Sequence, residues 1–261
     1  MIGIGRLEIT GTGIPIHGLP ARLEGFRIAL VADIHHGRFF GPEAVRRAVE
    51  AVNSAGPDLV VLAGDYVLGS ADYISPCMDI LSGISAPCCA VLGNHDHWEG
   101  PEETLRLLSD RVRARTLVNS SMRIGPAGES LLVCGVGDFW EDEQRLGECL
   151  SGRRAGEPVI LVSHNPDYAE ELAPGEVDLV LAGHTHGGQV VLPFFGAPML
   201  PSFYGQKYRS GLVSRGGTSV YVSRGVGVGS PPVRLNCRPE IAVLTLEGRS
   251  PRGVPGERSG G

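Results

Sequence analysis

Five apolar segments of this 261-residue chain each end in a polar side chain of a kind that binds metal ions. Each segment has the length of a buried strand, and its last residues include Asp, Asn or His. The segments span residues 28–35, 59–65, 90–95, 159–164 and 179–186. A single ending of this type would be an ordinary turn, since Gly-Asp is common after a strand. In an open α/β sheet, however, the ligand site lies at the carboxyl ends of the strands, so five such endings predict one convergent site.

The segments between these strands predict helices. Gly41-Pro42 opens an amphipathic helix that ends at Gly56-Pro57, directly before the strand leading to Asp65, which indicates a right-handed βαβ unit. Further helices are expected over 72–82, 101–110 and 141–150 and from Pro166. Strands are expected over 6–16, 27–32, 59–63, 88–92, 114–118, 121–124, 130–136, 159–163, 178–182, 189–192, 219–223 and 241–246. The second half is richer in strands, so we expect a four-layer α/β/β/α sandwich of two mixed sheets with helices outside.

The length and the C-terminal composition predict the domain organisation. A chain of 261 residues with 42% hydrophobic residues is expected to form one domain over residues 1–248. Residues 249–261 consist mainly of Arg, Ser, Pro and Gly. They offer little to bury and are expected to be a disordered tail.

Charge and cysteine content indicate which class of partner and which cell compartment to expect. Twenty-three basic against 29 acidic residues give a net charge of −6, so no nucleic-acid partner is expected. The six cysteines form no C-x-x-C pair and are interpreted as free thiols of a reducing compartment. With no signal-peptide pattern and no apolar stretch of about 18 residues, a cytoplasmic protein is expected.

The polar endings supply eight candidate residues for a metal centre. They are Asp33, His35, Asp65, Asn94, His95, His164, His184 and His186. Alternate residues of an extended chain point to one side, so Asp33-x-His35 and His184-x-His186 each present two ligands together. Carboxylate with imidazole suits Mn, Fe or Zn better than Ca, which prefers oxygen alone. The Asp65 carboxylate has two oxygens and can bridge two ions.

These motifs resemble the calcineurin-like metallophosphoesterases in order, residue type and spacing. In chain order they are Asp33-x-His35, Gly64-Asp65, Gly93-Asn94-His95-Asp96, His164 and Gly183-His184-x-His186. Four further segments are similar to a bacterial branch of that family, which includes phosphodiesterases and a UDP-2,3-diacylglucosamine pyrophosphatase of lipid A biosynthesis. These segments are Gly187-Gly188-Gln189, Leu192-Pro193-Phe194, Lys207-Tyr208 and Ser223-Arg224-Gly225-Val226-Gly227.

The resemblance implies two divalent metal ions, with Mn expected and Fe or Zn as alternatives. By that resemblance the first ion is held by Asp33, His35 and His186, and Asp65 bridges. The second ion is held by Asn94, His164 and His184. A metal-bridging hydroxide would attack a phosphodiester or pyrophosphate bond in line, and His95 would protonate the leaving oxygen or stabilise its charge.

One position departs from the family pattern. Many relatives carry a second Asp three residues after the bridging Asp, where it orients the catalytic histidine. This chain has Leu68 there, and Asp96 and Asp72 are the nearest alternatives in sequence. The residue that orients His95 therefore stays open.

Four residues are candidates for substrate binding. Arg224 lies in a Gly-rich loop and either contacts a phosphate or is an ordinary surface residue. His36 either touches substrate or is a solvated loop residue. Phe194 and Phe203 belong to an apolar, proline-containing segment that either packs on the protein's own core or forms a wall for an acyl chain or a membrane contact. Trp98 and Trp140 are interpreted as packing residues.

Three functions remain at this point. The first is a metallophosphoesterase acting on a small phosphoester or a lipid-linked nucleotide such as a UDP-diacylglucosamine, with peripheral contact to the inner face of the membrane. The second is a general or cyclic-nucleotide phosphodiesterase. The third is a non-catalytic metal-binding scaffold, which the complete set of ligand positions disfavours.

Overall fold

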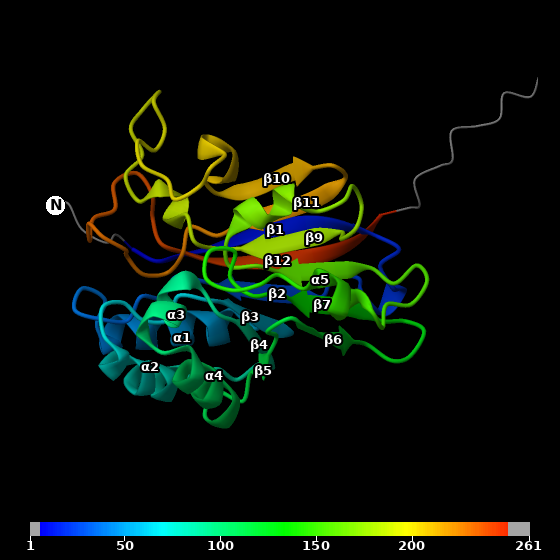
Figure 1. Ribbon diagram of the computed structural model, residues 1–261, viewed down its shortest axis with the longest axis horizontal. Helices are drawn as coiled ribbons and strands as arrows, with labels where there is room; N and C mark the ends of the chain where they lie inside the picture. The colour runs from blue at the N-terminus through cyan, green and yellow to red at the C-terminus, as the bar shows by residue number, and fades with distance from the viewer. Residues whose placement is uncertain (1–5, 250–261) are drawn as a thin grey trace, which may run out of the picture.

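Two six-stranded β-sheets form the framework of the protein in the computed structural model, which describes residues 6–249 (Figure 1). The first sheet has the order β1 (Glu8–His17), β12 (Glu240–Arg249), β2 (Arg27–Val31), β3 (Leu59–Ala63), β4 (Cys88–Val91) and β5 (Arg115–Thr116). The second has the order β10 (Gly211–Arg215), β11 (Thr218–Val222), β9 (Leu179–Ala182), β8 (Val159–Val162), β7 (Leu131–Gly135) and β6 (Ser120–Ile124).

Both sheets are mixed, as expected. In the first, β2 to β5 run parallel, and β12 pairs antiparallel with β2 while β1 runs parallel to β12 at the edge. In the second, β7, β8, β9 and β11 run parallel, and β6 and β10 are antiparallel edge strands. Most of the parallel strands are therefore central, where helices and the facing sheet can cover them.

Four of the helices pack on the outer faces of the two sheets, whereas the short α3 (Asn94–Glu99) lies at the carboxyl edge of the first sheet. The four are α1 (Pro42–Ala55), α2 (Ile74–Leu81), α4 (Pro101–Asp110) and α5 (Leu146–Leu150). Figure 1 shows α1, α2 and α4 gathered on one side of the molecule. Proline at the first turn of α1 and α4 starts each helix without losing a hydrogen bond, because the first N–H groups have no partner inside the helix.

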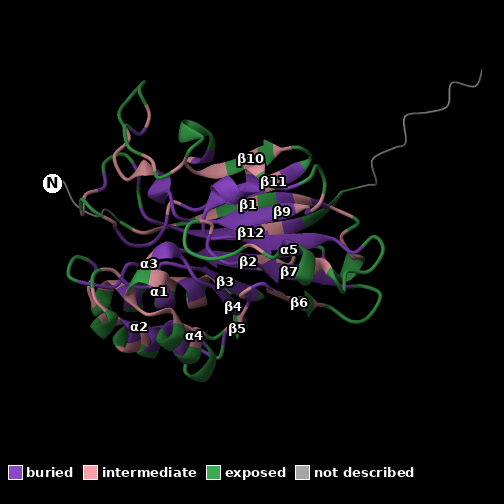
Figure 2. Cartoon of the chain, viewed as in Figure 1, coloured by how far each residue is buried: buried purple, intermediate pink, exposed green. Residues whose placement is uncertain are grey.

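Alternation along the strands builds three apolar layers. In β3, Val60 and Leu62 pack with α1, α2 and α4, while Leu59 and Val61 point to the other sheet. The layer between the sheets joins residues of both, and a third layer lies under α5. Figure 2 shows the central strands as the buried interior and the outer sides of the helices as exposed. The α/β/β/α sandwich expected from the sequence is confirmed.

Some expected elements differ from the structure. The helix expected over 141–150 begins only at Leu146, because Asp138 accepts the N–H groups of Trp140 and Glu141 in a turn. The helix from Pro166 is a short 3-10 turn. Residues 189–192 form isolated bridges rather than a strand, since Gln189 has a left-handed backbone with φ of 51°.

The structure describes only the first residue of the expected C-terminal tail. Arg249, expected to begin the tail, is the last residue of β12. Residues 250–261 lie outside the described residues, and a single domain over 1–248 stays a prediction. No helix in the described part of the chain is both long and apolar enough to cross a membrane.

Candidate metal centre

The backbone is strained at five of the predicted metal ligands. Asp33, His35, Asp65, His184 and His186 have φ angles of 54°, 48°, 58°, 68° and 52°. Non-glycine residues seldom adopt this left-handed region, and such strain persists where the surrounding structure enforces it, often at functional sites. Each of these residues follows β2, β3 or β9 within a few positions, so the strain turns the chain sharply at the carboxyl ends of the strands.

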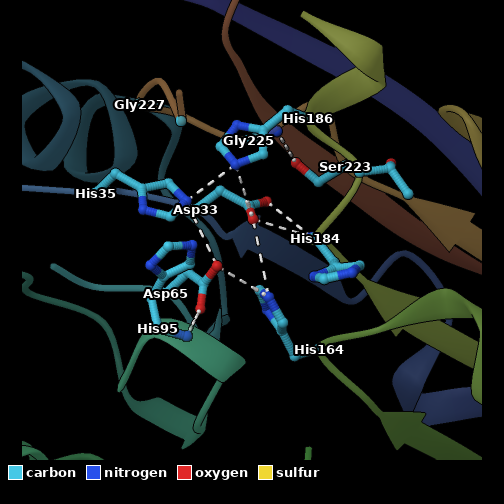
Figure 3. A network of polar contacts seen from close by, with 12 residues as sticks. Asp33, His35, Asp65, His95, His164, His184, His186, Ser223, Gly225 and Gly227 are labelled. Carbon is cyan, nitrogen blue, oxygen red and sulfur yellow. Dashed lines mark hydrogen bonds and ion pairs between the residues drawn. The ribbon is translucent and has the colours of Figure 1, made fainter. Parts of the chain in front are cut away.

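The first group of side chains lies around Asp33, His35 and His186. Nε2 of His35 is 2.9 Å from Nε2 of His186, and Nε2 of His186 is 3.5 Å from Oδ1 of Asp33. Asp65 lies beside them, with its Oδ2 atom 3.4 Å from Nε2 of His35. All four side chains point toward a common centre (Figure 3).

The second group shares Asp65 with the first. Oδ2 of Asp65 is 3.2 Å from Nε2 of His164, and Nδ1 of His184 is 3.0 Å from Oδ1 of Asn94. Potential donor atoms of Asp65, His164 and His184 lie within 4.8 Å of one another. The two groups therefore meet at the carboxylate predicted to bridge.

Contacts between the sheets hold this arrangement. Nδ1 of His164, after β8 of the second sheet, is 2.6 Å from the carbonyl oxygen of Ala63 in β3 of the first. The N–H of His184, after β9, donates to Oδ1 of Asp33 at 3.0 Å. The site thus spans the junction of the two sheets at their carboxyl edges, where an α/β fold places its ligands.

The donor atoms fit metal ions. With Nδ1 of His164 donating to Ala63, its buried Nε2 is the atom left for a metal ion; it makes no hydrogen bond within the described chain and faces Oδ2 of Asp65. Two atoms that share an ion at about 2.1 Å each, at roughly 90°, lie about 3 Å apart. The observed spacings of 2.9, 3.0, 3.2 and 3.5 Å agree with shared ions.

Burial holds most of the imidazoles in the neutral form that a metal ligand requires. It lowers the pKa of His35 and that of His184 to about 3, and it also lowers the pKa of His186. At His164 burial acts in the same direction, but the facing Asp65 and Asp33 carboxylates outweigh it and raise the pKa. Protons and metal ions therefore compete for His164.

His95 lies beside this centre and follows Asn94 directly in the chain. Its backbone N–H donates to Oδ1 of Asp65 at 2.9 Å, and its half-buried ring meets the rings of His35 and Trp98 edge-on at 4.8 and 4.5 Å. Potential donor atoms of His35, Asp65 and His95 also lie within 4.8 Å of one another. Burial is the main cause that lowers the pKa of His95.

The two carboxylates considered as orienting partners of His95 have other contacts. Buried Asp96 accepts the backbone N–H groups of Asp65 and Gly93 on Oδ2, at 2.7 and 2.9 Å, and that of Tyr66 on Oδ1 at 2.9 Å. Exposed Asp72 bonds to Ser70. Asp96 thus supports the backbone under the bridging residue.

Two glycines of the motifs allow the close approach of these loops. A Cβ atom on Gly93 would lie 2.3 Å from Oδ1 of Asp65, and one on Gly183 would lie 2.6 Å from Oδ2 of Asp33. Real Cβ contacts are never this short, so any side chain at either position would displace a predicted ligand.

A cavity of about 700 Å³ opens over the centre. Asp65, Asn94, His95, His184 and His186 line its floor. The side walls include Trp98 and Trp140, both expected to be packing residues but 55% and 41% exposed. Met199 and Leu200 stand on the wall formed by the apolar segment after the last motif.

The four predicted substrate residues lie outside the lining of this cavity. Arg224 contacts Glu8 and Glu240 at 3.0 and 3.3 Å. His36 is buried, with Nδ1 2.9 Å from the carbonyl oxygen of Phe40, so neither a substrate contact nor a solvated ring describes it. Phe194 and Phe203 project into solvent, 105% and 80% exposed.

Sequence reasoning missed Arg234. This buried guanidinium donates to the carbonyl oxygens of Arg224 and Gly227, each at 2.7 Å, and lies 3.4 Å from Nδ1 of His186. It ties the loop after β11 to the loop that carries His186. An arginine in a loop after a Pro-Pro pair carries no pattern that distinguishes it from a surface residue.

Comparisons with known proteins agree with this geometry. The family model described as calcineurin-like phosphoesterase matches residues 26–188. The chain is 34% identical to phosphodiesterase YaeI of Escherichia coli over 85% of this chain and 82% of the relative. It is 31% identical to metallophosphoesterase YkuE of Bacillus subtilis over 92% and 86%. The chain belongs to the calcineurin-like phosphoesterases, enzymes that use divalent metal ions.

Solved structures share the fold at low sequence identity. TT1561 of Thermus thermophilus matches with a TM-score of 0.52 and 17% identity, over 77% of this chain and 89% of that one. The NAD nucleotidase of Haemophilus influenzae matches with a TM-score of 0.53 and 17% identity, over 77% and 45%. These matches support the sandwich architecture.

Proposed function

We propose that this protein is a dinuclear metal-dependent phosphodiesterase. The observation that carries the proposal is the convergence of six ligand-type side chains, contributed by both halves of the sandwich, on the two sides of a seventh, Asp65. The name of the relative YaeI, a phosphodiesterase, favours a diester among the phosphoesters. Residues 1–248 act as one catalytic domain in this proposal.

The side chains divide into two metal sites. Asp33, His35 and His186 hold one ion, and Asn94, His164 and His184 hold the other. Asp65 contacts both groups and bridges them. Two bound ions supply Lewis acidity to the phosphate oxygens and lower the pKa of a water, which makes a hydroxide nucleophile available near neutral pH.

The remaining chemistry belongs to His95. Its half-buried ring borders both the centre and the open cavity, so one ring nitrogen can reach the oxygen of a departing alcohol. Donation of a hydrogen bond or a proton there stabilises the charge that develops as the P–O bond breaks. Two neighbouring rings keep the His95 ring in place, with buried His35 on one side and exposed Trp98 on the other.

The test is the bridging residue. Asp65→Ala should lower the occupancy of both metal sites and abolish Mn-dependent hydrolysis of bis(p-nitrophenyl) phosphate. Asp79→Ala, which changes an exposed carboxylate paired with Arg111, is the matched control and should keep both ions and full activity. Two tightly held ions in the Asp65 variant would contradict the bridging role. An inactive wild type with both ions bound would favour the scaffold function.

A lipid-linked substrate is a second candidate, and the apolar segment 190–204 favours it. Phe194, Phe195 and Phe203 are 105%, 84% and 80% exposed, whereas Met199 and Leu200 of the same segment line the cavity. Such an exposed apolar surface is typical of a lipid or protein contact. A chain entering the cavity along this segment gains about 0.8 kcal/mol per buried methylene.

In this second candidate function, the substrate is a UDP-diacylglucosamine-like precursor, and the protein contacts the membrane surface on the cytoplasmic side. Its test compares kcat/KM for acylated and deacylated forms of one phosphoester, in the wild type and in Phe194→Ser/Phe203→Ser. A preference for the acylated form that the double substitution removes would support it. No preference in the wild type would leave the general or cyclic-nucleotide phosphodiesterase. Mn is the ion we expect, to be checked by elemental analysis against Fe and Zn.

A further inference from the structure

The walls of the cavity over the metal centre carry no charge of their own. Outside Asp65 and the histidines of the floor, the described residues that line it are neutral, including Trp98, Trp140, Met199 and Leu200. Any negative charge on a substrate must therefore be met at the floor, where the metal ions bind.

Three basic residues of the surrounding loops face other partners. Lys207 forms an ion pair with Glu170, and Arg224 forms ion pairs with Glu8 and Glu240. Arg234 is buried among backbone carbonyl oxygens behind His186. A second anionic group placed against the cavity wall would lose its hydration without gaining one of these cations, which is unfavourable.

The two tryptophans stand at the mouth of the same cavity. The ring of Trp98 lies 4.5 Å from that of His95 at an angle of 68°, and the ring of Trp140 lies 4.3 Å from that of His184 at 90°. Each indole thus touches the centre with part of its surface and leaves about half exposed. Large, rigid aromatic rings of this kind dominate recognition when a ligand covers them.

We propose that Trp98 and Trp140 are specificity-determining residues, which hold a flat apolar substituent of a phosphodiester that carries a single negative charge. This inference rests on the proposed phosphodiesterase activity and narrows its substrate class. The neutral walls disfavour diphosphates and phosphorylated nucleotides, including UDP-linked precursors, and they favour diesters with aromatic or other apolar arms.

The first experiment varies the arm that does not leave. Phenyl p-nitrophenyl phosphate and methyl p-nitrophenyl phosphate share the leaving group and the charge. The kcat/KM of each ester is divided by its rate of alkaline hydrolysis, which corrects for intrinsic reactivity. The ratio of the two corrected values then reports recognition of the arm. We expect the wild type to prefer the phenyl ester roughly tenfold or more. Trp98→Ala/Trp140→Ala should bring the ratio close to one, and Trp98→Phe/Trp140→Phe should keep most of it.

Controls separate recognition from damage to the centre. Phe39→Ala removes a side chain that is 48% exposed outside the cavity lining and should leave the ratio unchanged. Metal content and thermal unfolding of the tryptophan variants show whether the centre is intact, and the ratio is unaffected by a uniform loss of active enzyme. A ratio near one in the wild type, or one that the Ala variants retain, would overturn the role of the tryptophans.

The second experiment varies the charge. The p-nitrophenyl ester of thymidine 5′-phosphate and its 3′-phosphorylated form differ by one anionic group, and we expect the extra phosphate to lower kcat/KM roughly tenfold or more in the wild type. Met199→Arg should reduce that penalty, whereas Met199→Gln should not. Equal or better hydrolysis of the 3′-phosphorylated ester, or an unchanged penalty in Met199→Arg, would overturn the charge argument.

These outcomes are distinct from failure of the proposed function. If wild-type enzyme loaded with Mn hydrolyses none of the four esters, the phosphodiesterase itself is wrong. If it hydrolyses them without the predicted preferences, the phosphodiesterase stands and the specificity is wrong.

Discussion

The hydrogen bonds of the buried Asp96 carboxylate predict how much stability its removal should cost. Its two oxygens accept three backbone N–H groups, from Asp65, Tyr66 and Gly93, at 2.7 to 2.9 Å. Asp96→Ala leaves these buried donors without a partner, at about 1–3 kcal/mol for each that no water satisfies. We expect a total loss of about 3–5 kcal/mol, a large fraction of the roughly 5–15 kcal/mol that stabilises a typical protein.

Denaturant unfolding of the metal-free proteins measures this loss directly. A fall of about 3–5 kcal/mol corresponds to roughly 6–20 °C in Tm for a chain of this size. Asp96→Asn should lose less, because one amide oxygen can still accept the N–H groups of Asp65 and Gly93 while its NH₂ group faces that of Tyr66. Exposed Asp72, bonded to Ser70, is the matched control, and Asp72→Ala should change stability by less than about 0.5 kcal/mol.

Two results would refute the reasoning. An Asp96→Ala loss below about 1 kcal/mol would mean that water or a local shift satisfies the three donors. A variant of normal stability whose activity falls only through a shifted pH profile would instead make Asp96 a partner of His95.

The remaining predictions concern catalysis, pH and metal. His95→Ala should keep both ions and lower turnover about 10²–10⁴-fold, less for esters with better leaving groups; an equal loss across leaving groups of different pKa would argue against the acid role. Although burial opposes it, hydrogen bonds from Arg123, Ser130 and the Arg154 backbone lower the pKa of Glu157 from 4.5 to about 2. The stability that Glu157 adds over Glu157→Gln, up to about 3 kcal/mol, should therefore be full above pH 4.5 and vanish as the pH falls toward 2 in urea titrations. Chelation should abolish hydrolysis and lower stability by about 3 kcal/mol relative to protein held at a hundredfold excess of metal over its Kd, and Mn should restore both.

The strand endings were predictable because they depend on local rules. An apolar run followed by Asp or His is visible in the sequence, and parallel strands must bring their carboxyl ends to one edge. The same rules predicted β2, β3, β4, β8 and β9 and the layers around them. The order of the motifs also predicted the family, which the comparisons confirm.

The long-range contacts were not predictable in this way. His36 follows a ligand and was expected in solvent or near substrate, yet it is buried against Phe40 because the loop turns inward. Trp98 and Trp140 were expected to pack, yet both are exposed at the cavity. Arg224 was expected to contact a phosphate or lie free at the surface, yet it is bound by Glu8 and Glu240. Arg234 was not singled out in the sequence, yet it is buried behind His186. Each outcome depends on which distant segment arrives beside the residue, and no local pattern encodes that.

In the proposed mechanism, Leu68 in place of a second Asp changes the protonation state of His95 and leaves its role in place. A carboxylate beside an imidazole raises its pKa, because it favours the charged form. His95 has ring contacts with His35 and Trp98, and burial lowers its pKa. The histidine is therefore neutral at neutral pH, and in the proposed mechanism it would stabilise the leaving oxygen by donating a hydrogen bond from an uncharged ring. A neutral imidazole helps strongly basic leaving groups less than a charged imidazolium would, so in this mechanism kcat should fall more steeply with leaving-group pKa in this chain than in relatives that keep the second Asp. A shallower dependence of kcat on leaving-group pKa in this chain would contradict that interpretation and indicate a charged His95.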